Sequence, residues 1–329
     1  MGEKIAIGGL EKELEVNCPF NNDVKGVDAE APKENIAYDD LDNVQEPQAN
    51  NGGILGDNLS NASNGVDNTW KGAPYEPPRL EQKDKKPPKD SKRRDGTKYP
   101  KPWAWVRVPG TKEIETGNFP FTVAAHHLIP GNASLYNEDN DLQNYLIKGK
   151  IIESVDGKSW TIKYHIGYNV NGAHNGVWLP GNYAIRSRSS PTKVTWGKMG
   201  HEDWQLNYVA ACVKVAKGQF HDAHGDYNDS VRELLNKIAK KLYYHHCSLC
   251  DDKDKVPPPY RIKQRLYNLS RYFKNNLTLE PSQWRRPWFT SDRWRDVIFK
   301  NKAEKPCKAF IEAFNQASCV EIEMINRKD

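Results

Sequence analysis

The sequence lacks long apolar runs and has few cysteines. Its 329 residues have a mean hydropathy of −0.84, and no stretch approaches the roughly 18 apolar residues that a membrane helix needs. The N-terminal MGEKIAIGGLEKELEVN lacks the apolar core of a secretory signal, so we expect no membrane insertion and any export by a route that reads no such signal. Six cysteines do not make a disulfide scaffold in a chain of this length, so reduced thiols are expected.

Charge is unevenly distributed along the chain. Residues 1–70 carry 4 Lys/Arg against 14 Asp/Glu, residues 71–110 carry 12 against 5, and the remainder carries 32 against 24. A basic body suits a polyanionic partner such as nucleic acid, although many basic surfaces are only solvated faces.

Apolar periodicity is missing from residues 21–70, and prolines alternate with lysines over 77–102. These features predict a largely irregular leader over 1–110, with a short ordered piece at 3–20. Beyond it, strand-like segments precede helix-like ones, which predicts an α+β fold. The expected strands lie at 103–108, 121–129 and 159–168, and the expected helices at 203–216, 228–242, 262–273 and 304–318.

Three segments hold most of the unusual polar residues: AAHHLIP (124–130), GYNVNGAHNGVWLPG (167–181) and GQFHDAHGDYNDSV (218–231). Neighbouring histidines on a strand point to opposite faces, so they share a site only if the strand ends there, and Pro130-Gly131 supplies a bend. The Asn-Gly pairs of the second segment favour positive φ and tight turns. A histidine pair alone more often packs than does chemistry, so the ordered set of three segments matters more than the pair.

In that order, AAHHLIP, NGVWLP and HGDYNDSV resemble the AHH nucleases, a branch of the HNH and endonuclease-VII-like superfamily, over roughly 121–240. The resemblance implies a ββα-metal nuclease core. It makes His126 a metal ligand, His127 the general base and His224 a second ligand. Asn175 would pin the hairpin and orient the base. His221 would be a companion ligand or phosphate contact, although it lies three residues from His224 where the family usually has four.

The resemblance also implies a divalent metal ion, with Mg²⁺ first and Zn²⁺, Mn²⁺ or Ni²⁺ as alternatives. His174, Arg186 and Arg188 are further candidates for substrate contact. Physically, a cation neutralises charge on the phosphodiester while an imidazole with a pKa near neutrality takes a proton from water. The activity expected is hydrolysis of DNA.

AHH nucleases are found mostly at the C-terminal ends of bacterial polymorphic toxins, so the resemblance implies a toxin used against competing bacteria. Its partners would be DNA, a cognate immunity protein, and a secretion apparatus or adaptor such as a type VI machine. The protein would be made in the bacterial cytoplasm, leave without a signal peptide and act in the cytoplasm of the target cell. The predicted division is a leader or secretion-recognition segment (1–110), a nuclease domain (111–250) and a helical, basic extension (251–329).

Two further motifs leave alternatives open. YYHHCSLC (243–250) places Cys247 and Cys250 at zinc-knuckle spacing, but no second Cys-x-x-Cys follows, and ordinary thiols fit as well. PSQWRRPWFTSDRWRD (281–296) interleaves tryptophan with arginine, which fits a grip on DNA or a packed helical core. The rival functions are therefore an RNA-cleaving toxin and a non-catalytic, zinc-stabilised nucleic-acid-binding protein.

Overall fold

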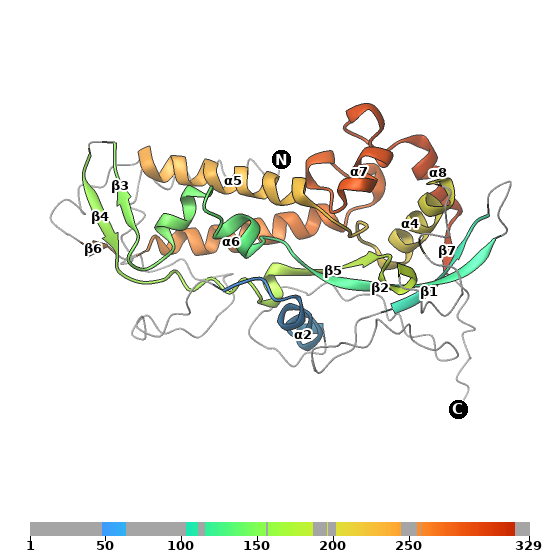
Figure 1. Cartoon of the computed structure of the whole chain (residues 1–329), viewed down its shortest axis with the longest axis horizontal. Coiled ribbons are helices and arrows are strands. Elements are labelled where there is room, and N and C mark those ends of the chain that lie inside the picture. The colour runs from blue at the N-terminus through green and yellow to red at the C-terminus, as the bar shows by residue number, and fades with distance from the viewer. Residues whose placement is uncertain are drawn as a thin grey trace. The chain divides into compact units, whose positions relative to one another are not determined.

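The α+β class is confirmed by the computed structural model, which describes residues 48–63, 103–110, 116–155, 157–186, 196, 202–244, 255–256 and 258–319 (Figure 1). The described residues fall into two compact units. Unit 1 draws on the ranges 1–74, 127–177 and 225–275, and unit 2 on 75–126, 178–224 and 276–329. Each unit thus combines segments far apart in sequence, whereas the sequence analysis divided the chain into three consecutive parts.

Unit 2 is built on a four-stranded sheet of order β5-β2-β1-β7. Its strands are β1 (Trp103–Val108), β2 (Gly117–His127), β5 (Gly176–Gly181) and β7 (Ser318–Cys319). β1 and β2 run antiparallel from Trp103↔Thr122 to Val108↔Gly117. Val106 and Val108 alternate with a more exposed Arg107, the pattern expected of a strand with one buried face.

Helices complete unit 2. They are α3 (Tyr183–Arg186), α4 (Glu202–Ala216), α7 (Asp292–Ile298) and α8 (Lys308–Gln316). α4 packs against β1 and α8, and its apolar residues are buried on most faces. The phenol of Tyr208 on α4 donates a hydrogen bond to the carbonyl of Pro120 at 3.0 Å, which ties this helix to β2.

Unit 1 contains the long helices α5 (Gly225–Tyr244) and α6 (Tyr260–Leu277, assigned to unit 1 up to residue 275). The ring of Tyr227 on α5 lies 6.1 Å from that of Phe273 on α6. A small sheet of order β3-β4-β6 completes it, with β3 (Ile151–Glu153), β4 (Ser159–Ile162) and β6 (Lys255–Val256). The apolar residues predicted for α5 are buried, as helical spacing requires.

A helix that the sequence analysis did not predict, α2 (Gly52–Ser63), lies inside the segment read as a leader. Asn51 caps it, because its side-chain oxygen accepts hydrogen bonds from the backbone N–H groups of Gly53 and Ile54, both at 3.0 Å. Leu55 and Leu59 are buried, and a Cβ on Gly176 would meet both of them. The leader therefore contributes packed structure to unit 1, and the expectation of a largely irregular segment was wrong at 52–63.

Several local predictions were also wrong. The strand expected over 159–168 stops at Ile162, and α5 begins at Gly225, three residues before the expected start at 228. The Asn-Gly glycines do not adopt positive φ: Gly172 has φ −69° and Gly176 has φ −130°. A short 3-10 turn (Ala173–Asn175) lies between them instead.

None of the helices in the described part of the chain combines the length and apolar character needed to cross a bilayer. Four predicted features lie outside the described residues: the ordered piece at 3–20, Arg188, Cys247 and Cys250.

Candidate metal centre

Three of the predicted histidines gather in unit 2. His126 comes from the end of β2, while His221 and His224 come from the loop that precedes α5. One ligand atom from each lies within 4.8 Å of the others, and the ring centroids are 4.8 to 5.1 Å apart. His126 is 2% exposed, so the cluster has one buried and two half-buried members. The predicted set of metal-ligating residues is therefore brought together.

The loop that carries His221 and His224 is not helical. Its backbone is fixed from both directions. The His221 N–H donates to the carbonyl of Pro180 at 2.7 Å, which anchors the loop to the end of β5. The rings converge because the loop is tied to the sheet that also carries His126.

Outer hydrogen bonds orient two of the rings. His224 Nδ1 lies 2.7 Å from the carbonyl oxygen of Asp222, and since a carbonyl only accepts, Nδ1 carries the proton. The lone pair of neutral His224 is then on Nε2. Nδ1 of His221 is 2.9 Å from the hydroxyl of Tyr183, which leaves Nε2 of His221 as its natural ligand atom. Metal-binding histidines commonly use one ring nitrogen in this way to hold the other in place.

The C-terminal extension clamps this loop. Asp222 N–H donates to the carbonyl of Thr290 at 3.0 Å, and Asp292 N–H donates to the carbonyl of Ala223 at 2.7 Å. The Thr290 hydroxyl adds a hydrogen bond to the carbonyl of Phe220 at 3.0 Å. The extension thus supports the histidine loop, a role that its sequence did not reveal.

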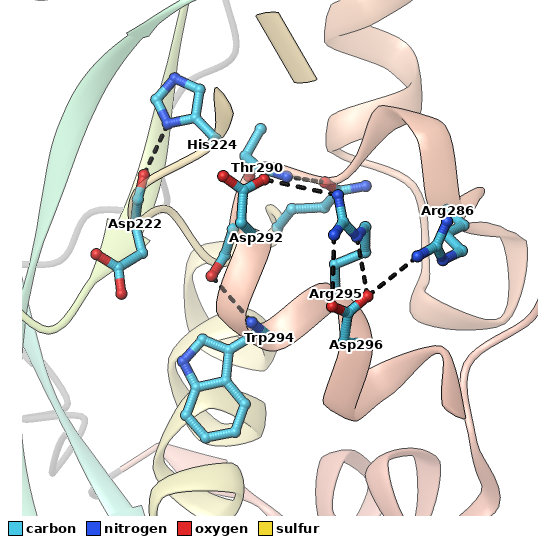
Figure 2. A network of polar contacts seen from close by, with 10 residues as sticks. Asp222, His224, Arg286, Thr290, Asp292, Trp294, Arg295 and Asp296 are labelled. Atoms are coloured by element: carbon cyan, nitrogen blue, oxygen red, sulfur yellow. Dashed lines mark hydrogen bonds and ion pairs between the residues drawn. The ribbon is translucent and has the colours of Figure 1, made fainter. Parts of the chain in front are cut away.

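Arginines brace the clamping segment itself. Arg286 and Arg295 both pair with Asp296, at 3.1 and 3.2 Å (Figure 2). The neighbouring Arg295, together with Arg286, lowers the pKa of Asp296.

Gly181 and Tyr183 are site residues that the sequence analysis missed. A Cβ on Gly181 would lie 2.7 Å from Cδ2 of Tyr183 and 3.0 Å from the backbone oxygen of His221. Only glycine therefore lets the end of β5 approach both groups. The motif VWLPG contained this glycine, but nothing in its spacing pointed to the tyrosine two residues later.

The donor set fits a divalent transition metal. Neutral imidazole nitrogen suits Zn²⁺, Ni²⁺ and similar ions, whereas Mg²⁺ prefers an octahedron of oxygen ligands. Three histidines also match the protein ligand count of catalytic zinc sites, which leave coordination open for substrate or water. This chemistry favours the alternatives Zn²⁺ and Ni²⁺ over the Mg²⁺ that we expected first.

His127, the predicted base, belongs to unit 1 and is 8% exposed. Its Nε2 lies 2.9 Å from Oδ1 of Asn171, an asparagine that the sequence analysis treated only as part of a turn. The base candidate therefore has a direct partner, Asn171, that the sequence did not point to.

The side chain of Asn175, predicted to pin the hairpin, hydrogen-bonds to two backbone segments. Its side-chain oxygen accepts from the Ile129 N–H at 2.8 Å, and its amide nitrogen donates to the carbonyls of Ile129 and Val170 at 2.9 and 2.8 Å. The hydroxyl of Ser270 donates to the same oxygen at 3.1 Å. Asn175 is fully buried and joins the segment after His127 to the 3-10 turn.

The two predicted substrate contacts that the structure describes, His174 and Arg186, differ in burial. His174 is 7% exposed, and its ring lies 5.2 Å from Tyr168 and 4.6 Å from Tyr267. The ring of His174 is thus buried beside two tyrosines, and its contact with a phosphate stays a prediction. Arg186 is exposed at the end of α3 and stays a candidate.

The tryptophans of the C-terminal extension form core. Trp284 and Trp294 are fully buried and Trp288 is 8% exposed. The Trp284 ring lies 5.3 Å from Phe289 and 5.6 Å from Phe310. Of the two readings of the Trp/Arg segment, packing is the one that the tryptophans follow.

The chain matches no family model, no curated protein and no solved structure.

Proposed function

We propose that this protein is a metal-dependent endonuclease that hydrolyses phosphodiester bonds of DNA. The observation that carries the proposal is the gathering of His126, His221 and His224, two of them oriented by outer hydrogen bonds. β2 and β5 are neighbours in one sheet, and two of these histidines lie just ahead of α5, which supports a ββα-metal arrangement. The AHH-like motifs supply the reaction class.

The residues divide the work. His126, His221 and His224 would hold a divalent cation, which when bound neutralises charge on the phosphate and stabilises the leaving 3′-oxygen. His127, next to His126 in the chain, takes one proton from the attacking water as its oxygen bonds to phosphorus and the bond to the 3′-oxygen breaks. A proton from solvent then completes the 3′-hydroxyl. Asn175 keeps the backbone after His127 in place.

The same resemblance extends the proposal to a toxin that acts in competing bacteria and is neutralised by an immunity protein. The acidic leader suits recognition by a secretion apparatus or adaptor, since residues 1–70 carry 14 acidic against 4 basic side chains. A growth assay tests this extension: cytoplasmic expression should arrest growth, and His127→Ala should relieve the arrest.

The rival proposals are an RNA-cleaving enzyme and a zinc-stabilised binder without catalysis. The burial of Trp284 and Trp294 weakens the binder, because it needs those rings as a contact surface. RNA cleavage would use the same site chemistry, so only a comparison of DNA and RNA substrates distinguishes it from DNA cleavage.

The experiment incubates purified protein with supercoiled plasmid or with tRNA, in the presence of Mn²⁺, Ni²⁺, Zn²⁺ or Mg²⁺. We expect nicked and linear plasmid, no cleavage in EDTA, and loss of most activity in His127→Ala, since a general base contributes on the order of 10²–10⁴-fold. Degraded tRNA beside intact plasmid would move the substrate to RNA. Plasmid that is shifted on a gel but never cut, with His127→Ala behaving like the natural protein, would favour the binder.

A further inference from the structure

One amide group connects the N-terminal segment to His127. The side chain of Asn171 is buried, and its Oδ1 lies 2.9 Å from His127 Nε2. The same oxygen accepts from the Asn51 N–H at 2.8 Å. The amide nitrogen donates to the carbonyl of Ala49 at 3.1 Å and to Oε1 of Gln48 at 3.3 Å. Three of the four contacts of this amide therefore come from residues 48–51.

These contacts fix which end of the amide faces His127. A backbone N–H only donates and a backbone carbonyl only accepts, so Asn51 must meet the amide oxygen and Ala49 the amide nitrogen. Turning the amide over would set donor against donor and acceptor against acceptor. Because the oxygen faces His127, the proton of the neutral ring lies on Nε2 and the basic lone pair lies on Nδ1.

We propose that residues 48–51 set the tautomer of His127 through Asn171, which makes the N-terminal segment a working part of the site. Asn171 is a positioning residue, since it acts on the reacting water only through His127. The catalytic consequence rests on the proposed function, whereas the tautomer itself does not. A ring in the other tautomer would present an N–H where the mechanism needs a lone pair.

The segment is held by contacts that do not involve the amide of Asn171. Oδ1 of Asn50 accepts from the Gly131 N–H at 2.7 Å, and Nδ2 of Asn58 donates to the backbone carbonyl of Asn171 at 2.8 Å. Leu55 is fully buried against Gly176, where a larger residue would collide with it. α2 thus places residues 48–51 at Asn171 as part of the packed structure of unit 1.

The test uses the full chain with three variants and Asn58→Ala as a further control. Asn171→Leu removes the amide at nearly constant volume. Asn51→Pro deletes the N–H that faces Oδ1, and Asn51→Ala is its matched control, because both lose the cap of α2 but only proline loses the N–H. The pair also keeps the test open if Asn171→Leu does not fold.

The first readout is the ¹⁵N NMR signature of the His127 ring in metal-free protein, at a pH where the ring is neutral. We expect the Nε2–H form in the natural protein and in Asn51→Ala, and a growing share of the Nδ1–H form in Asn51→Pro and Asn171→Leu. Asn58→Ala should leave the tautomer unchanged, because it removes a hydrogen bond to the backbone of Asn171 only. A natural protein in the Nδ1–H form, or an Asn51→Pro spectrum identical to that of Asn51→Ala, would overturn the proposal.

The second readout is steady-state cleavage of DNA. In Asn171→Leu, kcat should fall about 10- to 100-fold with KM unchanged, since part of the base's contribution is lost and no substrate contact is removed. An unchanged kcat with an altered tautomer would overturn the catalytic part of the inference. The expected tautomers in a protein that cuts no nucleic acid would overturn the proposed function while supporting the positioning of His127.

Discussion

In His224 and His221, Nδ1 is hydrogen-bonded within the protein, so Nε2 is the nitrogen that would ligate a metal. The Asp222 carbonyl and the Tyr183 hydroxyl occupy Nδ1 of the two rings. Such outer bonds reduce the freedom that a ligand side chain loses on binding and raise its basicity. The cluster therefore resembles a prepared metal site more than a chance meeting of three rings.

At this residue scale, loss of a metal ligand and loss of the base should affect metal affinity differently. We expect His224→Ala to weaken Zn²⁺ or Ni²⁺ affinity by at least about 100-fold, because even an outer-shell partner is worth about 10–100-fold. His127→Ala should leave the affinity nearly unchanged. Isothermal titration of both variants measures this directly. Equal losses in the two variants would place His127 among the ligands and contradict the division of roles.

Lys274 gives a pH dependence at the same scale. Burial lowers its pKa from 10.5 to about 8, so between these values the unfolded chain binds more protons than the folded one. The free energy of unfolding should then rise with pH from about 8 to 10.5. The whole shift corresponds to about 3 kcal/mol, and partial exposure of the side chain reduces it to about 1–2 kcal/mol.

Lys274→Met should remove that rise, as urea unfolding at a series of pH values can measure. Other lysines and tyrosines titrate in the same range, so the informative quantity is the difference between the natural protein and the variant. A difference that stays constant from pH 8 to 10.5 would show that burial does not perturb Lys274.

At the scale of elements, the C-terminal extension and the histidine loop act together. Thr290→Val removes the hydroxyl that donates to the Phe220 carbonyl, and Thr290→Ser keeps it. We expect Thr290→Val to lower the free energy of unfolding by about 1–2 kcal/mol, because a buried carbonyl loses its donor. Metal affinity should fall with it, while Thr290→Ser stays close to the natural protein. Urea unfolding and metal titration measure both quantities. Unchanged stability and metal affinity in Thr290→Val would show that the loop is held independently of the extension.

Helices and strands were predictable from sequence where the spacing of apolar residues matches the face that the fold buries. The strand at 103–108 and the helices α4, α5 and α6 followed from spacing, with only their ends displaced. The helix α2 was missed because its stability comes from Leu55 and Leu59 packing on a distant Gly176, in a segment otherwise rich in Asn and Gly. Tertiary contact decided that helix, and local pattern could not reveal it.

The candidate site divides in the same way. His126, His221 and His224 came from motif order, and the structure brings them together. Asn171 contacts the ring of His127, Tyr183 contacts the ring of His221, and Thr290 holds the loop of His221 and His224. These contacts join segments far apart in the sequence, for which a single sequence carries no spacing signal. Prediction thus reached the clustered histidines and missed the residues that hold them.

At the scale of the whole molecule, both compact units draw on the N-terminal, middle and C-terminal parts of the chain. Residues 48–63 belong to the first unit and the segment after residue 276 belongs to the second. Neither segment is a detachable appendage, so truncations at 110 or 250, the boundaries expected from composition, should unfold the protein instead of isolating a nuclease domain. Soluble, folded expression of residues 111–250 alone would contradict this.

The central claim is that a metal held by the three histidines enables cleavage with His127 as base. Its most direct measurement is cleavage of supercoiled plasmid by protein that native mass spectrometry shows to carry one divalent ion, beside His127→Ala carrying the same ion. The account predicts nicked and linear DNA from the natural protein and almost none from the variant. Plasmid left supercoiled by the verified metal-loaded natural protein, or equal cleavage by the two, would contradict it.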